Sequence, residues 1–211
     1  MNRLPLHQDL YLVAHDQSGK PLIHQSSMAL GLAGAALLDL ALDGRVAVAR
    51  GRVAVSDPVV PTGDPLTDDL LALVAGEPGD VRSPIKKVAE RAYDRTREDL
   101  VAAGVLLRVT KRVMGVLPTT RYQLADVASV VRASSGARSA VEGWKKPDAR
   151  GAALCGLVSV LRLEAELYLD LPSSELVGRL REIVRDSPRV VGELVAVVDT
   201  LVAEAAIAVY R

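Results

Sequence analysis

Three histidines, His7, His15 and His24, are the residues best suited to metal binding, and all lie near Asp9 and Asp16 at the start of the chain. Imidazole and carboxylate groups are common metal ligands, but a metal site needs them to converge on one point. On a helix, His7 and His15 would be separated by about 12 Å along the axis, because each residue rises about 1.5 Å. We therefore predict no metal site and interpret the histidines as surface or partly packed residues.

Carboxylates cluster in the segment GDPLTDDLL, which contains Asp64, Asp68 and Asp69. Paired carboxylates can act as general acid and base, but these three also fall in the first turns of a predicted helix, where exposed backbone N–H groups favour negative charge. The signatures GxGxxG, GxxxxGK[ST], GxSxG and HExxH are absent from the sequence. The one cysteine, Cys155, lies in an apolar run and is interpreted as a small buried hydrophobe. We predict no catalytic residue, no cofactor and no enzymatic activity.

A basic stretch in the middle of the chain is a candidate surface for anions. Lys87, Arg91 and Arg95 recur every four residues, which places them on one face of a predicted helix. Four acidic residues, at positions 90, 94, 98 and 99, are interleaved with them. A solvated face of mixed charge is therefore the alternative to an anion-binding face.

The segment RVMGVLPTTR, residues 112–121, has an apolar centre between basic residues. Its Gly and Pro argue against a buried helix, and exposed apolar groups generally contact a partner or a lipid surface. Basic neighbours fit an anionic membrane, since each Lys or Arg near such a surface contributes about 1 kcal/mol. The alternative is that the segment folds onto the protein's own core. The candidate contact residues are Arg112, Val113, Met114, Val116, Leu117 and Arg121.

Hydrophobic periodicity and capping residues predict a mainly α fold, in one globular domain over residues 1–211, with at least two β-hairpins. Hairpins are predicted over residues 45–56, with a turn at Arg50-Gly51, and over residues 106–124. Ser26, Ser27 and Ser83 are candidate helix starts. The Gly- and Ala-rich second helix is predicted to be central, the helix over 83–104 to be bent or divided near Arg91, and the last helix to be buried. The predicted helices cover residues 5–15, 28–44, 61–76, 83–104, 125–145, 149–170, 173–186 and 188–209.

The charge balance limits the classes of partner. The chain has 26 basic and 26 acidic residues, and this balance argues against nucleic acid as a ligand of the protein as a whole. The N-terminus has no signal-peptide pattern, and no apolar run reaches the roughly 20 uncharged residues of a spanning helix. These features predict a cytoplasmic protein whose membrane contact is peripheral. Arginine greatly outnumbers lysine and phenylalanine is absent, which indicates a GC-rich bacterial genome.

Four segments occur in an order that resembles the Golgi phosphoprotein 3 (GPP34) family: LALDGRVAVA, PTGDPLTDDLL, EDLVAAGVLL and LPTTRYQL. The similarity extends from about Leu4 to the C-terminus, and PTGD before an acidic and apolar helix is its most specific part. The resemblance implies a mostly helical domain decorated by β-hairpins. It also implies a peripheral membrane protein that binds phosphatidylinositol 4-phosphate through a Trp and several Arg residues, beside a hydrophobic hairpin.

The residues that match the family's headgroup pocket differ in this sequence. The resemblance places them at or near His24, Ala33, Glu90 and Tyr93. Arg91 and Arg95 are neighbours that could substitute for the missing arginines. Loss of two or three charge-assisted contacts, each worth about 1.5–3 kcal/mol, would weaken headgroup binding. The candidate headgroup residues are therefore His24, Lys87, Arg91 and Arg95.

We expect a peripheral membrane-associated protein at the inner face of the membrane, which binds anionic phospholipid through its basic face and the apolar hairpin tip. A first alternative is a winged-helix-like DNA-binding regulator, because a basic helix followed by a hairpin is the order of that motif. The zero net charge and the interleaved acidic residues argue against it. A second alternative is a structural homo-oligomer in which the hairpin over residues 106–124 contacts another subunit.

Overall fold

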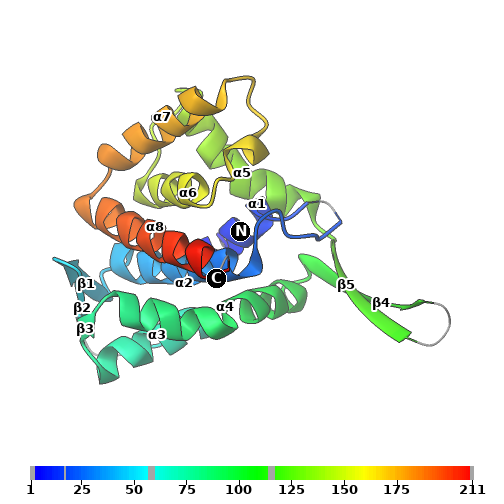
Figure 1. Cartoon of the computed structure of the whole chain (residues 1–211), viewed down its shortest axis with the longest axis horizontal. Coiled ribbons are helices and arrows are strands. Elements are labelled where there is room, and N and C mark those ends of the chain that lie inside the picture. Colours follow the sequence, from blue (N-terminus) through cyan, green and yellow to red (C-terminus); the bar gives the residue numbers. More distant parts are fainter. Residues whose placement is uncertain (1–2, 17, 57–59, 114–116, 210–211) are drawn as a thin grey trace.

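The computed structural model describes residues 3–16, 18–56, 60–113 and 117–209, without the side chains of residues 111–113, 117–119 and 209. Within these ranges the chain forms helices and two small antiparallel sheets (Figure 1), which confirms the predicted mainly α fold with β-hairpins. The helices are α1 (Leu6–Val13), α2 (Gln25–Leu42), α3 (Pro65–Gly76), α4 (Arg82–Ala102), α5 (Val127–Val141), α6 (Ala149–Val160), the 3₁₀ helix η1 (Glu164–Leu167), α7 (Ser173–Arg185) and α8 (Arg189–Val209). The strands are β1 (Val46–Ala49), β2 (Arg52–Val55), β3 (Gly79–Asp80), β4 (Leu106–Val113) and β5 (Leu117–Leu124).

Helix α2 lies at the centre of the fold, as its small residues predicted. It packs between α8 and the α3–α4 pair and also contacts α1 and α6 (Figure 1). Two glycines permit this close packing: a Cβ on Gly34 would lie 2.3 Å from Cγ2 of Val198, and a Cβ on Gly31 would lie 2.7 Å from Cδ1 of Leu161. Among the described residues, α2 is the one helix with the length and hydropathy of a membrane span, but 61% of it is buried by its neighbours.

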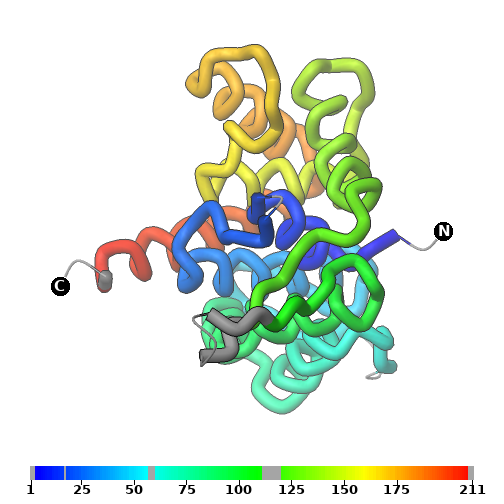
Figure 2. The backbone as a smooth tube through the Cα atoms, turned by 90° about the vertical axis from the view of Figure 1, so that its right-hand side faces the viewer, coloured from blue at the N-terminus to red at the C-terminus, as the bar shows by residue number. Residues whose placement is uncertain are grey.

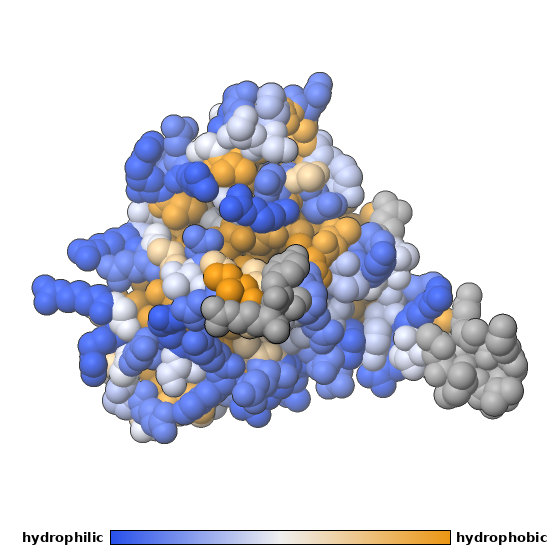
Figure 3. All heavy atoms as spheres, viewed as in Figure 1, coloured by the Kyte–Doolittle hydropathy of each residue, from blue (hydrophilic) through white to orange (hydrophobic). Residues whose placement is uncertain are grey.

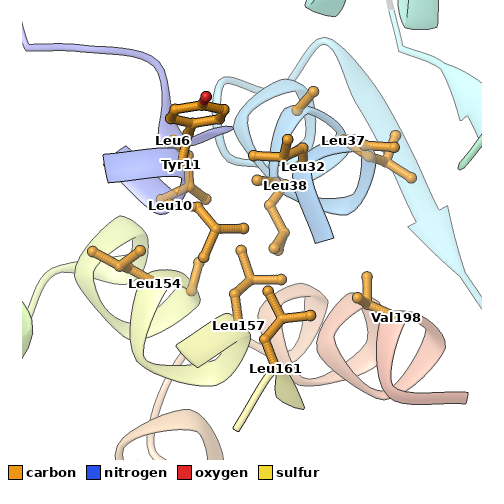
Figure 4. Close-up of a cluster of buried hydrophobic side chains, with 14 of the residues drawn as sticks. Leu6, Leu10, Tyr11, Leu32, Leu37, Leu38, Leu154, Leu157, Leu161 and Val198 are labelled. Atoms are coloured by element: carbon orange, nitrogen blue, oxygen red, sulfur yellow. The ribbon is translucent and has the colours of Figure 1, made fainter. Parts of the chain in front are cut away.

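The core is built from aliphatic side chains that four helices direct toward one another (Figure 4). Each fully buried Leu stabilises the fold by about 1.5–3 kcal/mol relative to an exposed one. Cys155 of α6 is completely buried, and burial raises the pKa of its thiol to about 12, so it is a small core residue as predicted. The labelled core residues are Leu6, Leu10 and Tyr11 of α1, Leu32, Leu37 and Leu38 of α2, Leu154 and Leu157 of α6 with the adjacent Leu161, and Val198 of α8.

The starts of α2 and α4 differ from the sequence prediction. Helix α2 begins after His24, whose Nδ1 accepts a hydrogen bond from the Ser26 backbone N–H at 3.4 Å, so the cap is a histidine and not a serine. Helix α4 begins at Arg82, one residue before the predicted Ser83, and the Asp80 carboxylate accepts the Arg82 backbone N–H at 2.9 Å. Helix α4 then continues without interruption to Ala102, so it is not divided near position 91.

The first hairpin is confirmed. Strands β1 and β2 are antiparallel, with Val46 opposite Val55, and β3 pairs with the other edge of β2. Arg50 and Gly51 form the connection with φ values of 52° and 72°. Positive φ at both central residues is the requirement of a type I′ turn, whose twist matches that of the flanking strands.

The predicted helix over residues 149–170 is wrong, because α6 ends at Val160. The Leu163 backbone N–H bonds to the Val158 carbonyl at 2.9 Å, and Arg162 adopts a left-handed φ of 58°. This pattern terminates an α-helix, and the chain continues as η1.

The last helix is not buried as predicted. One face of α8 packs against the core, while the opposite face is exposed, and the Ile207 side chain near its end is 59% exposed. Figure 2 shows the C-terminal end of α8 extending beyond the rest of the body. The helix is rich in apolar residues, but the described chain fully buries only the stripe formed by Val191, Leu194, Val198 and Leu201.

Candidate functional site

The β4–β5 hairpin extends away from the helical body (Figure 1). Its register pairs Leu106 with Leu124 and Val113 with Leu117, so the second predicted hairpin is confirmed. Four of the predicted contact residues, Arg112, Val113, Leu117 and Arg121, therefore belong to the paired strands. Met114 and Val116 lie outside the described residues, as do the side chains of Arg112, Val113 and Leu117.

The hairpin is basic and contains no acidic residue. From Val105 to Ala125 the sequence has Arg108, Lys111, Arg112 and Arg121 and no Asp or Glu. Of these, Arg108 and Arg121 have described side chains, and both are exposed. The positive charge of the hairpin is therefore not neutralised within the hairpin itself.

Three exposed apolar side chains near the base of the hairpin were not predicted from the sequence. Leu107 of β4 is 55% exposed, and Val127 and Val131, one turn apart on α5, are 64% and 58% exposed. Hydrophilic residues cover most of the outer surface in the view of Figure 3, and hydrophobic ones gather toward the middle of that face. The i, i+4 spacing of the two valines was visible in the sequence, but it did not reveal which face of α5 packs inward.

The base of the hairpin is fixed to the body through Tyr122. The Arg97 guanidinium lies 4.2 Å from the Tyr122 ring centroid, and that of Arg108 lies 5.6 Å from it on the hairpin side. Gly19 packs directly on the same strand, because a Cβ there would lie 1.7 Å from the Tyr122 carbonyl oxygen. Stacked cations of this kind contribute about 0.5–1 kcal/mol at exposed sites. The contacts hold the two strands in a defined position relative to α4.

His15 links α1 to α4 beside this base. Its ring stacks on Tyr11 with the centroids 3.8 Å apart. Burial lowers the pKa of His15 to about 4, so the ring is neutral at physiological pH. Its Nδ1 lies 2.7 Å from the Tyr11 carbonyl oxygen and must donate to it, which leaves Nε2 to accept the Tyr93 hydroxyl at 2.9 Å. A neutral ring with both nitrogens engaged is a structural element and not a free base.

The predicted basic face of α4 is an ion-paired face. Each of its three members has a carboxylate partner, two of them supplied by α3 and the residue after it. Exposed pairs of this kind contribute little stability, but they reduce the attraction of the face for an external anion. The pairs are Lys87 Nζ with Glu77 Oε2 at 2.6 Å, Arg91 Nε with Asp69 Oδ2 at 3.5 Å, and Arg95 Nε with Asp99 Oδ1 at 3.8 Å.

A hollow of about 440 Å³ lies between the start of α2 and α4, and its lining includes Glu90 and Tyr93, two of the four positions to which the resemblance assigns a headgroup pocket. His24 is exposed and comes one residue before Gln25, the first residue that lines the hollow. Ala33 is buried in the core and does not line it. Lys87, Arg91 and Arg95 do not line the hollow, so the structure does not bring the four predicted headgroup residues together. The residues on its α4 side are Lys86, Ala89, Glu90, Tyr93 and Asp94.

The charge of this α2–α4 hollow does not favour phosphate. It has two carboxylates, Glu90 and Asp94, against the single amine of Lys86. That amine lies 3.4 Å from a carboxylate oxygen of Glu204, which already balances it. Asp94 is paired with Arg97 at 2.6 Å, but Arg97 itself does not line the hollow. Among its described residues, the hollow therefore has no cation that is free to bind a phosphate group.

The PTGD segment, the most specific part of the family resemblance, has a structural role. Asp64 caps α3 by accepting the Thr67 backbone N–H at 2.9 Å, and both its oxygens lie 3.1 Å from Nε2 of the completely buried His7. Nδ1 of His7 lies 3.0 Å from the Thr96 hydroxyl, which joins α1, α3 and α4. Burial alone would raise the Asp64 pKa, but the hydrogen bonds from His7 and Thr67 outweigh it and lower the pKa to about 2.

His7 is thus an internal residue and not a surface or partly packed one as predicted, whereas partly buried His15 and exposed His24 fit that interpretation. Within the described ranges, no group of three or more His, Cys, Asp or Glu side chains is close enough to hold a metal ion. The buried His7 ring is held by contacts between helices, with Asp64 and Thr96.

Comparison with known families gives one match that covers nearly the whole chain. The sequence profile described as Golgi phosphoprotein 3 (GPP34) matches residues 6–206. No curated protein matches the sequence. The matched range includes α1 through most of α8, and hence both hairpins and the α2–α4 hollow.

Proposed function

The chain belongs to the Golgi phosphoprotein 3 family, and from this premise we propose that it is a peripheral membrane-binding protein without catalytic activity of its own. It contacts an anionic phospholipid surface at the inner face of the membrane. The β4–β5 hairpin is the contact element. The single observation that supports this assignment best is the composition of the hairpin, four basic residues and no acidic one, on an element that extends from the body (Figure 1).

Charge and apolar side chains act together in this mechanism. Basic residues steer the hairpin to the anionic surface, each contributing about 1 kcal/mol near it. The apolar residues of the tip, Met114, Val116 and Leu117, then enter the interfacial region, where burial of each CH₂ contributes about 0.8 kcal/mol. Exposed Leu107 and Val127 at the base extend the apolar contact toward the body.

The composition of the α2–α4 hollow leads us to propose that the protein recognises the negative charge of the membrane surface and does not select one lipid headgroup. Lys86 is paired with Glu204 and Asp94 with Arg97, so the Glu90 carboxylate leaves the hollow with a charge that repels a phosphate group. Phosphatidylinositol 4-phosphate therefore supports binding through its negative charge. At matched total charge, we expect it to bind no more tightly than phosphatidylserine.

Vesicle co-sedimentation tests this proposal. The chain is mixed with vesicles of phosphatidylcholine alone, or with phosphatidylserine or phosphatidylinositol 4-phosphate at matched total charge. Binding is expected only to the anionic vesicles, and Met114→Asp with Leu117→Asp is expected to abolish it. The matched control is Ser173→Asp with Ser174→Asp, which adds the same charge at the exposed start of α7. The proposal fails if the hairpin variant still binds like the unmodified chain.

The same reagents separate the two other functions. If Met114→Asp with Leu117→Asp converts a larger assembly to a monomer and leaves vesicle binding intact, the hairpin is a subunit contact. If the chain is retained on duplex DNA in a salt-sensitive way, and Arg91→Glu with Arg95→Glu abolishes retention, the DNA-binding function gains support.

A further inference from the structure

A second hollow, of about 260 Å³, lies where α6, α7 and α8 meet. The residues that line this α6–α8 hollow belong to α6, α7 and α8, with Arg162 after the end of α6, and none of them belongs to the β4–β5 hairpin. Gly156 of α6 permits the close approach of the three helices, since a Cβ there would lie 2.6 Å from Cγ2 of Val195 and 3.0 Å from Cγ2 of Val184. The polar groups on its walls are those of Ser159, Arg162, Arg181 and Asp199, and its apolar side chains include Val160 and Val184.

Arg162 and Arg181 both lack an acidic partner. Within the described parts of the chain, no carboxylate oxygen lies within 4.0 Å of either guanidinium. The other arginines of α7 differ in this respect: Arg179 pairs with Glu175 at 2.7 Å, and Arg185 is also ion-paired. Two exposed arginines without an acidic partner thus line one hollow, together with a single acidic residue, Asp199.

The backbone at Arg162 gives an independent reason to assign its side chain a role. Arg162 has a φ of 58° at the end of α6, a position that glycine usually occupies because it lacks a Cβ. An arginine in this conformation is less favourable for folding than glycine. Residues that are held in sparsely populated conformations cluster at active sites and ligand-binding sites.

We propose that the α6–α8 hollow binds the phosphate group of an amphiphilic phosphate ester. Arg162 and Arg181 are the two cationic ligands, because planar guanidinium groups match phosphate oxygens and bind them in pairs. The Ser159 hydroxyl supplies a further donor, and Val160 and Val184 contact the apolar part of the ligand. The site is separate from the hairpin, so it does not depend on the proposed membrane contact.

Isothermal titration calorimetry with two probes tests this site. The probes are dihexanoyl phosphatidic acid, at concentrations where it stays monomeric, and inorganic phosphate. Binding of the lipid alone would identify a membrane lipid as the ligand source, while equal binding of both would identify a soluble phosphate ester. Binding of either probe is expected to weaken by roughly tenfold to a hundredfold in Arg162→Gly and in Arg181→Gln, since each loses a charge-assisted contact.

Arg162→Gly distinguishes loss of a ligand from loss of the fold. Glycine suits the left-handed conformation, so this variant is expected to unfold at the same temperature as the unmodified chain or higher. Arg185→Gln, on α7 but outside the hollow, is the matched control and is expected to bind normally. The proposal is overturned if neither probe binds the unmodified chain, or if Arg162→Gly and Arg181→Gln bind like the control.

Discussion

Removal of the hairpin's positive charge should weaken membrane binding by a calculable amount. The perturbation is the triple substitution Lys111→Gln, Arg112→Gln and Arg121→Gln, which leaves Arg108 beside Tyr122 in place. Each basic residue near an anionic surface contributes about 1 kcal/mol. Loss of three therefore removes about 3 kcal/mol, which lowers the partition coefficient by a factor on the order of one hundred.

The assay is a titration of the chain with phosphatidylserine-containing vesicles at low and at physiological salt. The matched control carries Lys87→Gln, Arg91→Gln and Arg95→Gln, which changes the net charge equally but removes residues that are already ion-paired on α4. Because screening confines the attraction to about 8–10 Å from the surface, this control is expected to lose less than tenfold. The reasoning is refuted if both triple variants lose affinity equally, or if the hairpin variant loses none.

Three further predictions concern the helical body. Asp64→Ala removes the α3 cap and leaves buried His7 without its partner, so it should lower the free energy of unfolding by about 2–4 kcal/mol; an unchanged urea midpoint would contradict this role. Burial lowers the His15 pKa from 6.5 to about 4, so between pH 4 and pH 6.5 the unfolded chain binds more protons than the folded one. The free energy of unfolding should therefore rise by about 3 kcal/mol as the pH increases across this range. In His15→Gln, this part of the pH dependence, measured by urea denaturation, should disappear. Gly34→Ala places a Cβ 2.3 Å from Cγ2 of Val198 and should lower the melting temperature, and Val198→Ala should restore part of the loss; additive effects of the two changes would argue against this contact.

The parts of the fold that the sequence predicted are those whose causes are local. Gly31 and Gly34 in an otherwise apolar helix indicated a central position, and Arg50-Gly51 between alternating valines indicated a tight hairpin turn. The end of α6 was missed because it depends on a left-handed arginine, where glycine would have given a signal. The exposure of Ile207 was missed because an apolar composition does not show how much of a helix the rest of the chain covers.

The candidate headgroup site shows the same limit. The spacing of Lys87, Arg91 and Arg95 correctly places them on one face of α4, but the carboxylates that pair with Lys87 and Arg91 come from α3 and the residue after it. Successive residues of a helix point about 100° apart. An offset of one residue therefore separates Arg91 from the hollow that Glu90 lines.

A fluorescent label at the hairpin tip tests the central claim most directly. Cys155 is completely buried, so Met114→Cys provides a selective site for an environment-sensitive dye such as NBD. Trp144, the one tryptophan, is 78% exposed and follows the far end of α5, a helix of 15 residues or about 22 Å, so it serves as an internal reference. With anionic vesicles, the dye emission is expected to rise and shift to the blue while the Trp144 emission stays unchanged. Unchanged dye emission on chains that co-sediment with the vesicles would contradict membrane contact through the hairpin.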